Sequence, residues 1–389
     1  MARGDLIIDA GNSHFADTDR RAKELTQHGL SFLGMGVSGG EAGAREGPSL
    51  MPGGPREAYE RVRPMLEAVA AKVDGEPCVA YLGPGSAGHF VKMVHNGIEY
   101  GLMQLIAETY DLMRRGLRMT NAEMHAVYDD WRQGELSSFL LDITCHIFRK
   151  TDPKTGALLL DSILDVARQK GTGKWTSQSA MDLQAPIPTI DVAVSMRDLS
   201  AYQEERVRAE RVLPGPVAPF HGDRAVFLKE LKGAFHAVMI VTYAQGMALL
   251  RRASAAREYG LDLATVARIW RGGCIIRAAF LETIRAAYQQ QHDLPNLLLD
   301  TVVANRLAGP QVDLRAVTCA AGRLGVPMPA LMAALGYYDA YRSARLPTNL
   351  IQAQRDFFGA HTYERTDQPR GKFFHIDWPE PTRPQLEMK

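Results

Sequence analysis

The chain has 389 residues, enough for about two or three domains that each bury a core. Its content of 46% hydrophobic and 23% charged residues is that of an ordinary globular protein, and the net charge of +1 gives no general electrostatic case for a nucleic-acid or membrane partner. Cys78, Cys145, Cys274 and Cys319 form no C-x-x-C pair, which argues against a zinc site and for reduced thiols in a cytoplasmic protein.

The N-terminal part alternates between two hydrophobic periods. Residues 5–10 ("DLIIDA"), 30–37 ("LSFLGMGV") and 77–83 ("PCVAYLG") are typical of strands, whereas residues 18–28 and 55–73 carry the period of amphipathic helices. This order predicts a parallel sheet of the Rossmann type. Three strands make a thin sheet, so we interpret it as the remnant of a larger one.

From Ser86 to about Arg345 the pattern is helical. We expect helices at residues 86–118, 121–133, 222–258, 274–291 and 311–325. The uncharged stretch 234–250 falls short of the roughly 20 apolar residues of a membrane span and is predicted to be a buried core helix. The predicted fold class is therefore a partial α/β sheet followed by a large all-α domain and a C-terminal arm.

The predicted domain boundaries follow from these changes of pattern. They are 1–85 for the partial sheet, 86–345 for the helical domain and 346–389 for the arm. The last segment is rich in aromatic residues and prolines and cannot form a core alone. It is either a disordered tail or an arm that packs on something else.

A literal G-x-G-x-x-G, Gly83 to Gly88, stands between the third strand pattern and the first long helix. A dinucleotide fingerprint needs a second strand after that helix, which ends in an acid that holds the ribose. Here the helix leads into more helix, and Pro84 removes one backbone amide. We interpret the motif as a glycine-rich break that starts a helix.

The helix behind these glycines is more informative. Lys92, His95, Asn96 and Glu99 are spaced i, i+3, i+4 and i+7, which places all four on one helix face. This mixture of an amine, an imidazole, an amide and an acid is either a catalytic stripe or a surface stripe of chance composition. In a desolvated cleft the lysine could act as a general base, and the carboxyl group could return a proton to the same substrate.

Several long segments resemble 6-phosphogluconate dehydrogenase, the decarboxylating enzyme of the pentose phosphate pathway. They include "GHFVKMVHNGIEYG", "IIDAGNSHFADTDRR", "GMGVSGGEAGAREGPSLMPGG", "ILDVARQKGTGKWT", "IWRGGCIIRAAFL" and "LPTNLIQAQRDFFGAHTYERTDQPRGKFFHIDW". The resemblance implies oxidative decarboxylation of 6-phosphogluconate to ribulose 5-phosphate and CO₂, with reduction of NADP. It also implies a homodimer, in which the arm completes the neighbour's site.

The resemblance also assigns roles to residues. Lys92 would accept the proton of the 3-hydroxyl as hydride leaves C3, and Glu99 would protonate C1 of the enediol after CO₂ has left. The residues that would contact substrate are Asn12, Ser38, Gly39, Gly40, His95, Asn96, Tyr100, Lys170, Arg197, Arg355 and His361, with Asn12 lying between substrate and nicotinamide. No metal is required, and no metal-ligand cluster appears in the sequence.

The family's first strand, its G-x-A-x-x-G turn and its loop for the 2′-phosphate do not appear in the sequence. We therefore expect weak or no NADP binding by this chain, with measurable binding of 6-phosphogluconate. One alternative is a catalytically impaired chain that dimerises and binds substrate. Another is a related β-hydroxyacid dehydrogenase, against which the predicted phosphate-binding cations argue.

Overall fold

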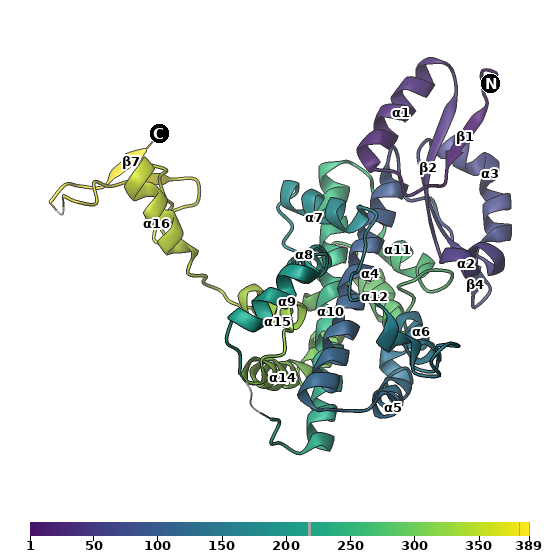
Figure 1. Ribbon diagram of the computed structural model, residues 1–389. Helices are drawn as coiled ribbons and strands as arrows, with labels where there is room; N and C mark the ends of the chain where they lie inside the picture. The colour runs from purple at the N-terminus through teal and green to yellow at the C-terminus, as the bar shows by residue number, and fades with distance from the viewer. Residues whose placement is uncertain (217–218, 381, 389) are drawn as a thin grey trace. The chain divides into compact units, whose positions relative to one another are not determined.

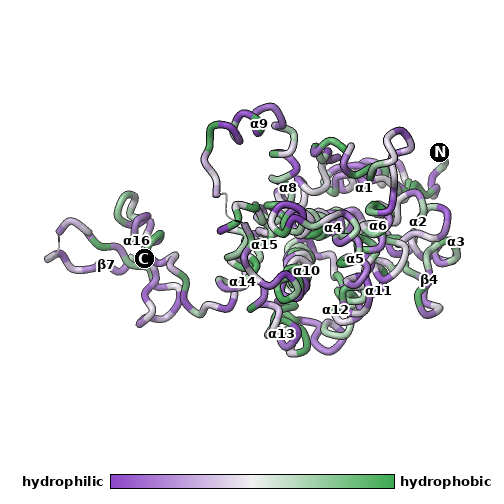
Figure 2. The backbone as a smooth tube through the Cα atoms, turned by 60° about the horizontal axis from the view of Figure 1, so that its bottom comes forward, coloured by the Kyte–Doolittle hydropathy of each residue, from purple (hydrophilic) through white to green (hydrophobic). Residues whose placement is uncertain are grey.

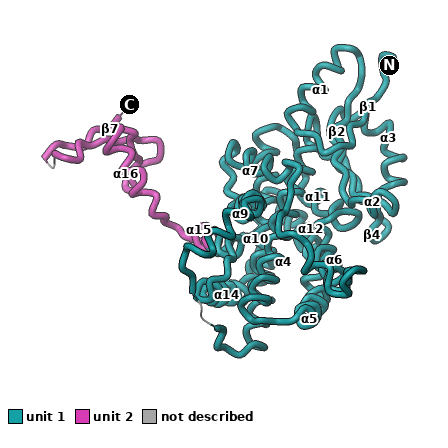
Figure 3. The backbone as a smooth tube through the Cα atoms, in the orientation of Figure 1, with its two compact units in different colours: residues 1–335 teal, residues 336–389 magenta. Residues whose placement is uncertain are grey.

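The computed structural model describes residues 1–216, 219–380 and 382–388 and divides into two compact units, Met1–Leu335 and Gly336–Lys389 (Figure 3). The first unit opens with a small sheet and continues as a helical bundle (Figure 1). The predicted fold class is thus confirmed. The predicted boundary at residues 85 and 86 lies inside the first unit and stays a prediction, as does the boundary at residues 345 and 346.

The sheet is mixed rather than parallel. Its elements are β1 (Leu6–Asp9), α1 (Phe15–Gln27), β2 (Ser31–Ser38), α2 (Gly40–Glu46), β3 (Ser49–Gly53) and α3 (Arg56–Val69), followed by the small hairpin of β4 (Lys72–Val73) and β5 (Glu76–Pro77). β1 pairs with β2 in parallel, and β2 pairs with β3 antiparallel.

The third strand predicted at residues 77–83 was wrong. Only Val79 of this stretch continues the sheet, through a single parallel bridge to Leu50. The third strand is instead β3, which the glycine-rich sequence around it concealed. A parallel return needs a crossover of about a dozen residues or more, and the short α2 turn between β2 and β3 allows only an antiparallel one.

Glycines let the first long helix lie directly on this sheet. A Cβ atom on Gly36 of β2 would overlap the side-chain stem of Lys92, with Cγ at 2.9 Å, and one on Gly34 would lie 2.9 Å from Nδ1 of His89. On the helix, a Cβ on Gly88 would collide with the carbonyl oxygens of Met51 and Gly34. Backbone therefore packs on backbone where helix and sheet cross.

The helical region holds most of the chain. Its elements are α4 (Ala87–Asp111), a π-helical turn (Leu112–Gly116), α5 (Asn121–Trp131), α6 (Phe139–Ile147), α7 (Thr172–Asp182), α8 (Pro188–Ser200), α9 (Gln203–Val212), α10 (Arg224–Ala256), α11 (Leu263–Ile269), α12 (Phe280–Gln290), α13 (Thr301–Leu307), α14 (Pro310–Leu324) and α15 (Pro329–Tyr341). Short 3-10 turns lie at Gly134–Leu136, Leu159–Ser162 and Leu297–Leu299. Of the predicted helices, the one at 274–291 is shorter than expected.

α10 is the core helix of this bundle. By length and composition it could cross a membrane, but 89% of its most apolar window is buried against the neighbouring helices, as predicted for residues 234–250. α9 is the opposite case, because it buries no residue and its hydrophilic chain stands away from the helices around α10 in Figure 2. The core of the helical region thus lies along α4 and α10.

The second unit carries α16 (Thr348–Gly359) and a hairpin of β6 (Phe373–His375) with β7 (Leu386–Met388). Among its described residues from 346 on, only Asp356 and Phe374 are buried. Large apolar side chains of α16, such as Phe357 and Phe358, are exposed. The segment predicted as a tail or an arm therefore has regular structure but little core of its own.

The contact of α4 with the sheet predicts an asymmetric response to glycine replacement. Gly88→Ala should lower the free energy of unfolding by at least about 2 kcal/mol, because the colliding atoms belong to the backbone and cannot rotate away. Gly322→Ala is the matched control within α14. It meets no atom within 4 Å and should raise stability by about 0.5–1 kcal/mol. Urea unfolding of both variants, followed by circular dichroism, measures the difference, and equal effects would contradict this packing.

Candidate functional site

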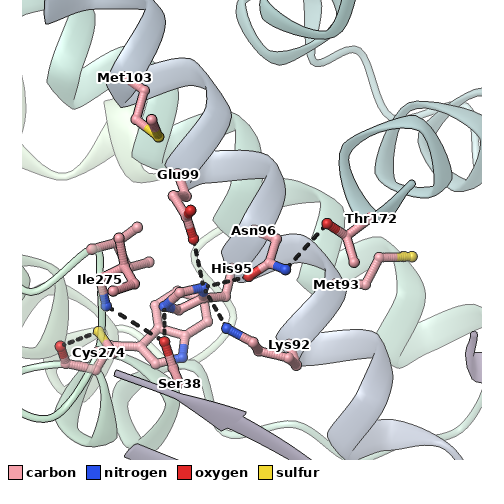
Figure 4. A network of polar contacts seen from close by, with 12 residues as sticks. Ser38, Lys92, Met93, His95, Asn96, Glu99, Met103, Thr172, Cys274 and Ile275 are labelled. Carbon is pink, nitrogen blue, oxygen red and sulfur yellow. Dashed lines mark hydrogen bonds and ion pairs between the residues drawn. The ribbon is translucent and has the colours of Figure 1, made fainter. Parts of the chain in front are cut away.

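The predicted stripe of α4 faces inward. α4 begins at Ala87, and its Lys92, His95, Asn96 and Glu99 side chains point to one side of the helix (Figure 4). Lys92 is 6% exposed and His95 is fully buried, while the Glu99 side chain keeps 22% of its surface. The face is therefore a partly enclosed polar site and not a solvated surface stripe.

His95 lies at the centre of these groups. Its Nδ1 atom is 3.4 Å from Nζ of Lys92, 3.1 Å from Oδ1 of Asn96 and 3.9 Å from Oε2 of Glu99. Its Nε2 atom lies 3.1 Å from the hydroxyl of Ser38 at the end of β2. One imidazole thus joins the amine, the amide and the acid of α4 to the sheet.

The glycines after Ser38 bring a distant loop to this point. Gly39 and Gly40 have φ values of +118° and +60°, which favour glycine. A Cβ on Gly39 would lie 2.6 Å from the carbonyl oxygen of Gly273, in the loop between α11 and α12. From that loop, the backbone N–H of Ile275 donates to the Ser38 hydroxyl over 3.4 Å.

α7 closes the other side of the stripe. Asn96 donates from Nδ2 to the Thr172 hydroxyl over 3.1 Å, at the start of α7. Gly97 allows this approach, since a Cβ there would lie 2.6 Å from Cγ2 of Thr176. Lys170 stands just before α7 and is exposed. The "KGTGKW" segment therefore contacts the stripe through its threonine.

Burial tunes the proton affinity of the amine. It lowers the pKa of Lys92 to about 8, although the negative charge of Glu99 and, to a smaller degree, Cys274 act to raise it. A lysine with such a pKa exchanges protons near neutral pH, unlike a solvated one. The amine is therefore suited to act as a base and, once protonated, as an acid.

Burial acts in the opposite direction on the acid. It raises the pKa of the Glu99 carboxyl, and the positive charges of Lys92 and Arg197 only partly oppose this. Burial and the charge of Lys92 hold the pKa of His95 well below its usual range, despite the hydrogen bond to Asn96. A neutral imidazole thus separates an amine and an acid whose pKa values have been moved toward each other.

The remaining predicted residues are distributed around this centre. Arg197 of α8 stacks on the Tyr100 ring, with Cζ at 3.5 Å from the ring centroid, and also contacts the Met103 sulfur. Asn12 is exposed on the loop after β1. Among the described contacts, neither Asn12 nor Lys170 is bonded to the network around His95.

Arg355 and His361 belong to the second unit. Arg355 lies on α16 and His361 follows its end, and both are exposed. Their predicted share in the site stays a prediction.

Sequence reasoning missed residues that reach the stripe from far along the chain. Thr172 lies inside a quoted motif but had no role, and the backbone of Ile275 contributes only an N–H group. Trp270 packs edge-on against His95 with ring centroids 5.6 Å apart. The glycines that follow Trp270 were the available signal in the sequence. Glycines allow tight turns, and such turns often bring one backbone segment close to another.

The glycine motif serves packing. Gly83 and Gly85 have φ values of +132° and +56°, and a Cβ on Gly83 would collide with the carbonyl oxygen of Tyr259. Together with the contact of Gly88 on the sheet, this accounts for all three motif glycines. It supports the interpretation of the motif as a turn that starts α4.

Among the described residues, one group of possible metal ligands occurs away from the stripe. The ligand atoms of His125, Asp129 and Cys145 lie within 4.8 Å of one another on α5 and α6. Arg132 donates from Nε to Asp129 over 2.8 Å, so a positive charge already neutralises the carboxylate. This arrangement disfavours a cation, and the sequence did not single out these residues.

Two family models match nearly the whole chain. The model for the C-terminal domain of 6-phosphogluconate dehydrogenase matches residues 88–378, and the model for the NAD binding domain of 6-phosphogluconate dehydrogenase matches residues 1–83. The chain belongs to the 6-phosphogluconate dehydrogenase family. The predicted family membership is confirmed.

Individual members of the family are similar over the same range. The decarboxylating 6-phosphogluconate dehydrogenase of Lactococcus lactis subsp. lactis is 51% identical over 97% of this chain and 80% of its own length. The NADP(+)-dependent, decarboxylating enzyme of Bacillus subtilis is 52% identical over 97% of this chain and 80% of its own length. The solved 6-phosphogluconate dehydrogenase of Plasmodium falciparum is 43% identical with a TM-score of 0.94, covering 97% of this chain and 81% of that one.

These similarities correct one expectation. Weak NADP binding was predicted from the lack of a glycine fingerprint, but the NAD binding domain model of the 6-phosphogluconate dehydrogenase family matches residues 1–83. The expectation of weak NADP binding is therefore not supported. The similarities also favour an enzyme over the alternative of a catalytically impaired chain.

Burial of the Lys92 amine predicts a stability cost. Because its folded-state pKa lies near 8 and below the unfolded value of 10.5, the charged amine lowers the free energy of unfolding below about pH 8, and this cost disappears as the pH rises toward 10.5. Lys92→Met should raise the free energy of unfolding at pH 7 by about 2–3 kcal/mol, with a smaller gain at pH 9.5. Urea unfolding at both pH values tests this, with the exposed Lys229→Met as control. A loss of stability at pH 7 would contradict the cost.

Proposed function

We propose that the chain catalyses the oxidative decarboxylation of 6-phosphogluconate to ribulose 5-phosphate and CO₂ with reduction of NADP. The observation that carries this proposal is the row of the buried Lys92 and His95 and the partly buried Glu99 on α4, in a chain of this family. The Bacillus subtilis relative bears the same activity in its name, and the Plasmodium falciparum structures include complexes with NADP⁺ and with 6-phosphogluconate.

Lys92 acts first, as a base. Its neutral amine, present in a large fraction near pH 8, takes the proton of the 3-hydroxyl while C3 loses hydride. The lysine is then protonated in a buried site, where its charge interacts strongly with a nearby dipole. That charge polarises the new ketone at C3, so the electrons released with CO₂ are drawn into an enediol.

Glu99 acts second, as an acid. Burial raises the pKa of Glu99, which favours the protonated carboxyl, and the residue lies two helical turns from Lys92 on the same face. It delivers this proton to C1 of the enediol, which gives ribulose 5-phosphate. The neutral imidazole between the two groups prevents a direct Lys92–Glu99 ion pair, which would fix both in their unreactive charged forms.

The substrate is held at both ends. Near the reacting carbons, Ser38, the amides of Gly39 and Gly40, His95 and Asn96 offer hydrogen-bond partners for the carboxylate and hydroxyl groups. At the other end of the substrate, the phosphate would be bound by Tyr100, Lys170 and Arg197. Arg197 suits a phosphate because its planar guanidinium can form two parallel charge-assisted hydrogen bonds.

The loop after β1 fits the nicotinamide end of NADP. Asp9 accepts hydrogen bonds from the Gly11 N–H (3.0 Å) and the Ser13 hydroxyl (2.7 Å), which fix the turn and leave Asn12 exposed. The Asp9 carbonyl oxygen also lies 3.1 Å from Nε2 of His89 on α4. Asn12 thus stands at the carboxyl end of a parallel strand, where α/β sheets bind ligands. NADP held beside this loop would supply the acceptor for the hydride from C3.

We also propose a cytoplasmic homodimer in which the arm completes the partner's site. Arg355 and His361 would supply the remaining phosphate contacts. The exposed Phe357 and Phe358 on α16 support this, because an arm with little core of its own gains stability by covering apolar surface on another chain. The free cysteines are consistent with a reducing compartment.

The assigned roles predict a separation of turnover from binding. Lys92→Met and Glu99→Gln should each lower kcat by orders of magnitude and leave the Kd for 6-phosphogluconate within about tenfold, since each removes a proton-transfer group. Matched controls on other elements are the exposed Lys229→Met and the partly buried Glu67→Gln, which should keep normal turnover. Steady-state assays and substrate titration give both quantities. Near-normal kcat in either active-site variant would refute the role assigned to that residue.

The shared site predicts complementation between two defective chains. Lys92→Met lacks the base, and a chain with both Arg355→Ala and His361→Ala lacks the arm contacts. A mixed dimer should contain one complete site if the arm reaches across, because the base of one chain meets the intact arm of the other. At substrate concentrations well below KM of the arm variant, co-expressed chains should exceed both parents in activity. Activity no greater than the average of the parents would mean that each arm serves its own chain.

A further inference from the structure

A buried carboxylate lies under the loop that presents His361. Asp356, the residue after Arg355 on α16, has no exposed surface. Its Oδ1 atom accepts the Thr362 N–H over 2.9 Å and lies 2.9 Å from Nδ1 of His375, while Oδ2 accepts the indole N–H of Trp378 over 2.9 Å and the N–H of Ile376 over 3.4 Å. Four groups from two later segments thus converge on one side chain.

The loop held by this carboxylate has an unusual backbone. Ala360 and Thr362, on either side of His361, have φ values of +48° and +58°, a region that costs a non-glycine residue about 1 kcal/mol or more. The His361 ring folds back over Gly359, where a Cβ would lie 2.7 Å from its Nε2 atom. Such a conformation persists only where surrounding contacts determine it, and the Thr362 N–H on Asp356 is one of those contacts.

Arg355 is tied to the same loop. Its guanidinium donates to Oε1 of Gln352 over 3.0 Å, and Nε2 of Gln352 donates to the carbonyl oxygen of Thr362. Both backbone groups of Thr362 are therefore hydrogen-bonded, the N–H to Asp356 and the carbonyl oxygen to Gln352. The two predicted phosphate-binding side chains are fixed relative to each other by these two neighbours on α16.

We propose that Asp356 is a positioning residue for substrate binding, which holds His361 and Arg355 in the geometry that binds the phosphate end of 6-phosphogluconate. This inference rests on the function proposed above. Asp356 has no exposed surface and does not touch the substrate. It acts through the loop between Gly359 and Thr362 and through the C-terminal hairpin residues that share its oxygens.

The chemistry of these contacts requires a carboxylate. Burial acts to raise the pKa of Asp356, but this effect is outweighed by hydrogen bonds from His375, Trp378, Thr362 and Ile376. The pKa is therefore lowered overall, and the group stays ionised at neutral pH. An ionised carboxylate offers acceptors on both oxygens. An asparagine of the same shape keeps one acceptor and turns an NH₂ group toward the donors at the other position, so the network cannot be satisfied.

The test compares Asp356→Asn with His361→Ala in the full-length enzyme. Asp356→Asn should raise KM for 6-phosphogluconate about tenfold and leave kcat within about twofold, because contacts to the distal phosphate bind substrate and transition state equally. Asp367→Asn is the matched control, since this exposed aspartate pairs only with Arg365 among the described salt bridges and should leave KM unchanged. A merely structural defect would reduce the active fraction and not KM.

A double variant separates positioning from other effects. If Asp356 acts through His361, then adding Asp356→Asn to His361→Ala should raise KM by much less than it does in the wild-type background. If Asp356→Asn raises KM by the same factor in both backgrounds, the positioning role alone is overturned. The same holds if Asp356→Asn leaves KM unchanged while His361→Ala raises it. An unchanged KM in His361→Ala overturns the assignment of His361 in the proposed function, and the positioning role with it.

A milder change guards against loss of folding. Trp378→Phe removes only the indole donor to Oδ2 of Asp356 and keeps the aromatic ring. It should raise KM in the same direction by a smaller factor, with kcat retained. If it folds and leaves KM unchanged, the network does not control the substrate contacts.

Discussion

The structure depends on the close contact between α4 and the small sheet, because that contact buries the Lys92 amine. Gly36 on β2 leaves room for the lysine stem, and Gly88 on α4 lets helix and sheet backbones touch. A larger residue at either position would lift the helix and admit water to the amine. The lowered pKa of Lys92 is thus a consequence of the burial that these two missing side chains allow, and the charge of Glu99 acts against it.

The same burial explains why an uncharged His95 lies between the amine and the acid. A direct ion pair of Lys92 with Glu99 would stabilise both charged forms and restore ordinary pKa values. A neutral imidazole forms hydrogen bonds without adding a charge, so the pKa of Lys92 stays lowered and the pKa of Glu99 stays raised. The site therefore carries two groups that are individually unfavourable in the folded state, a cost common where function requires perturbed groups.

Local periodicity made the common face of the polar residues on α4 predictable, whereas contacts between distant parts of the chain could not be predicted from periodicity. The spacing of Lys92 and Glu99 fixes their common face once a helix forms, so the sequence alone sufficed. Strand order was harder, because β3 pairs antiparallel through a short turn and the apolar stretch at residues 77–83 makes only one bridge. Thr172 and Ile275 reach the site by contacts across long stretches of chain, which no periodic pattern encodes.

The second unit shows how a segment without a hydrophobic core can still specify geometry. From residue 346 on, its described part buries one apolar side chain, Phe374, and one carboxylate, Asp356. Apolar burial is non-directional and tolerates small shifts, whereas a carboxylate that accepts several N–H groups fixes angles and distances. A buried charge is expensive unless every lone pair is used, and Asp356 meets that condition with four donors. Hydrogen bonds to the two oxygens of the buried Asp356 carboxylate thus fix the position of His361, which apolar packing alone could not do.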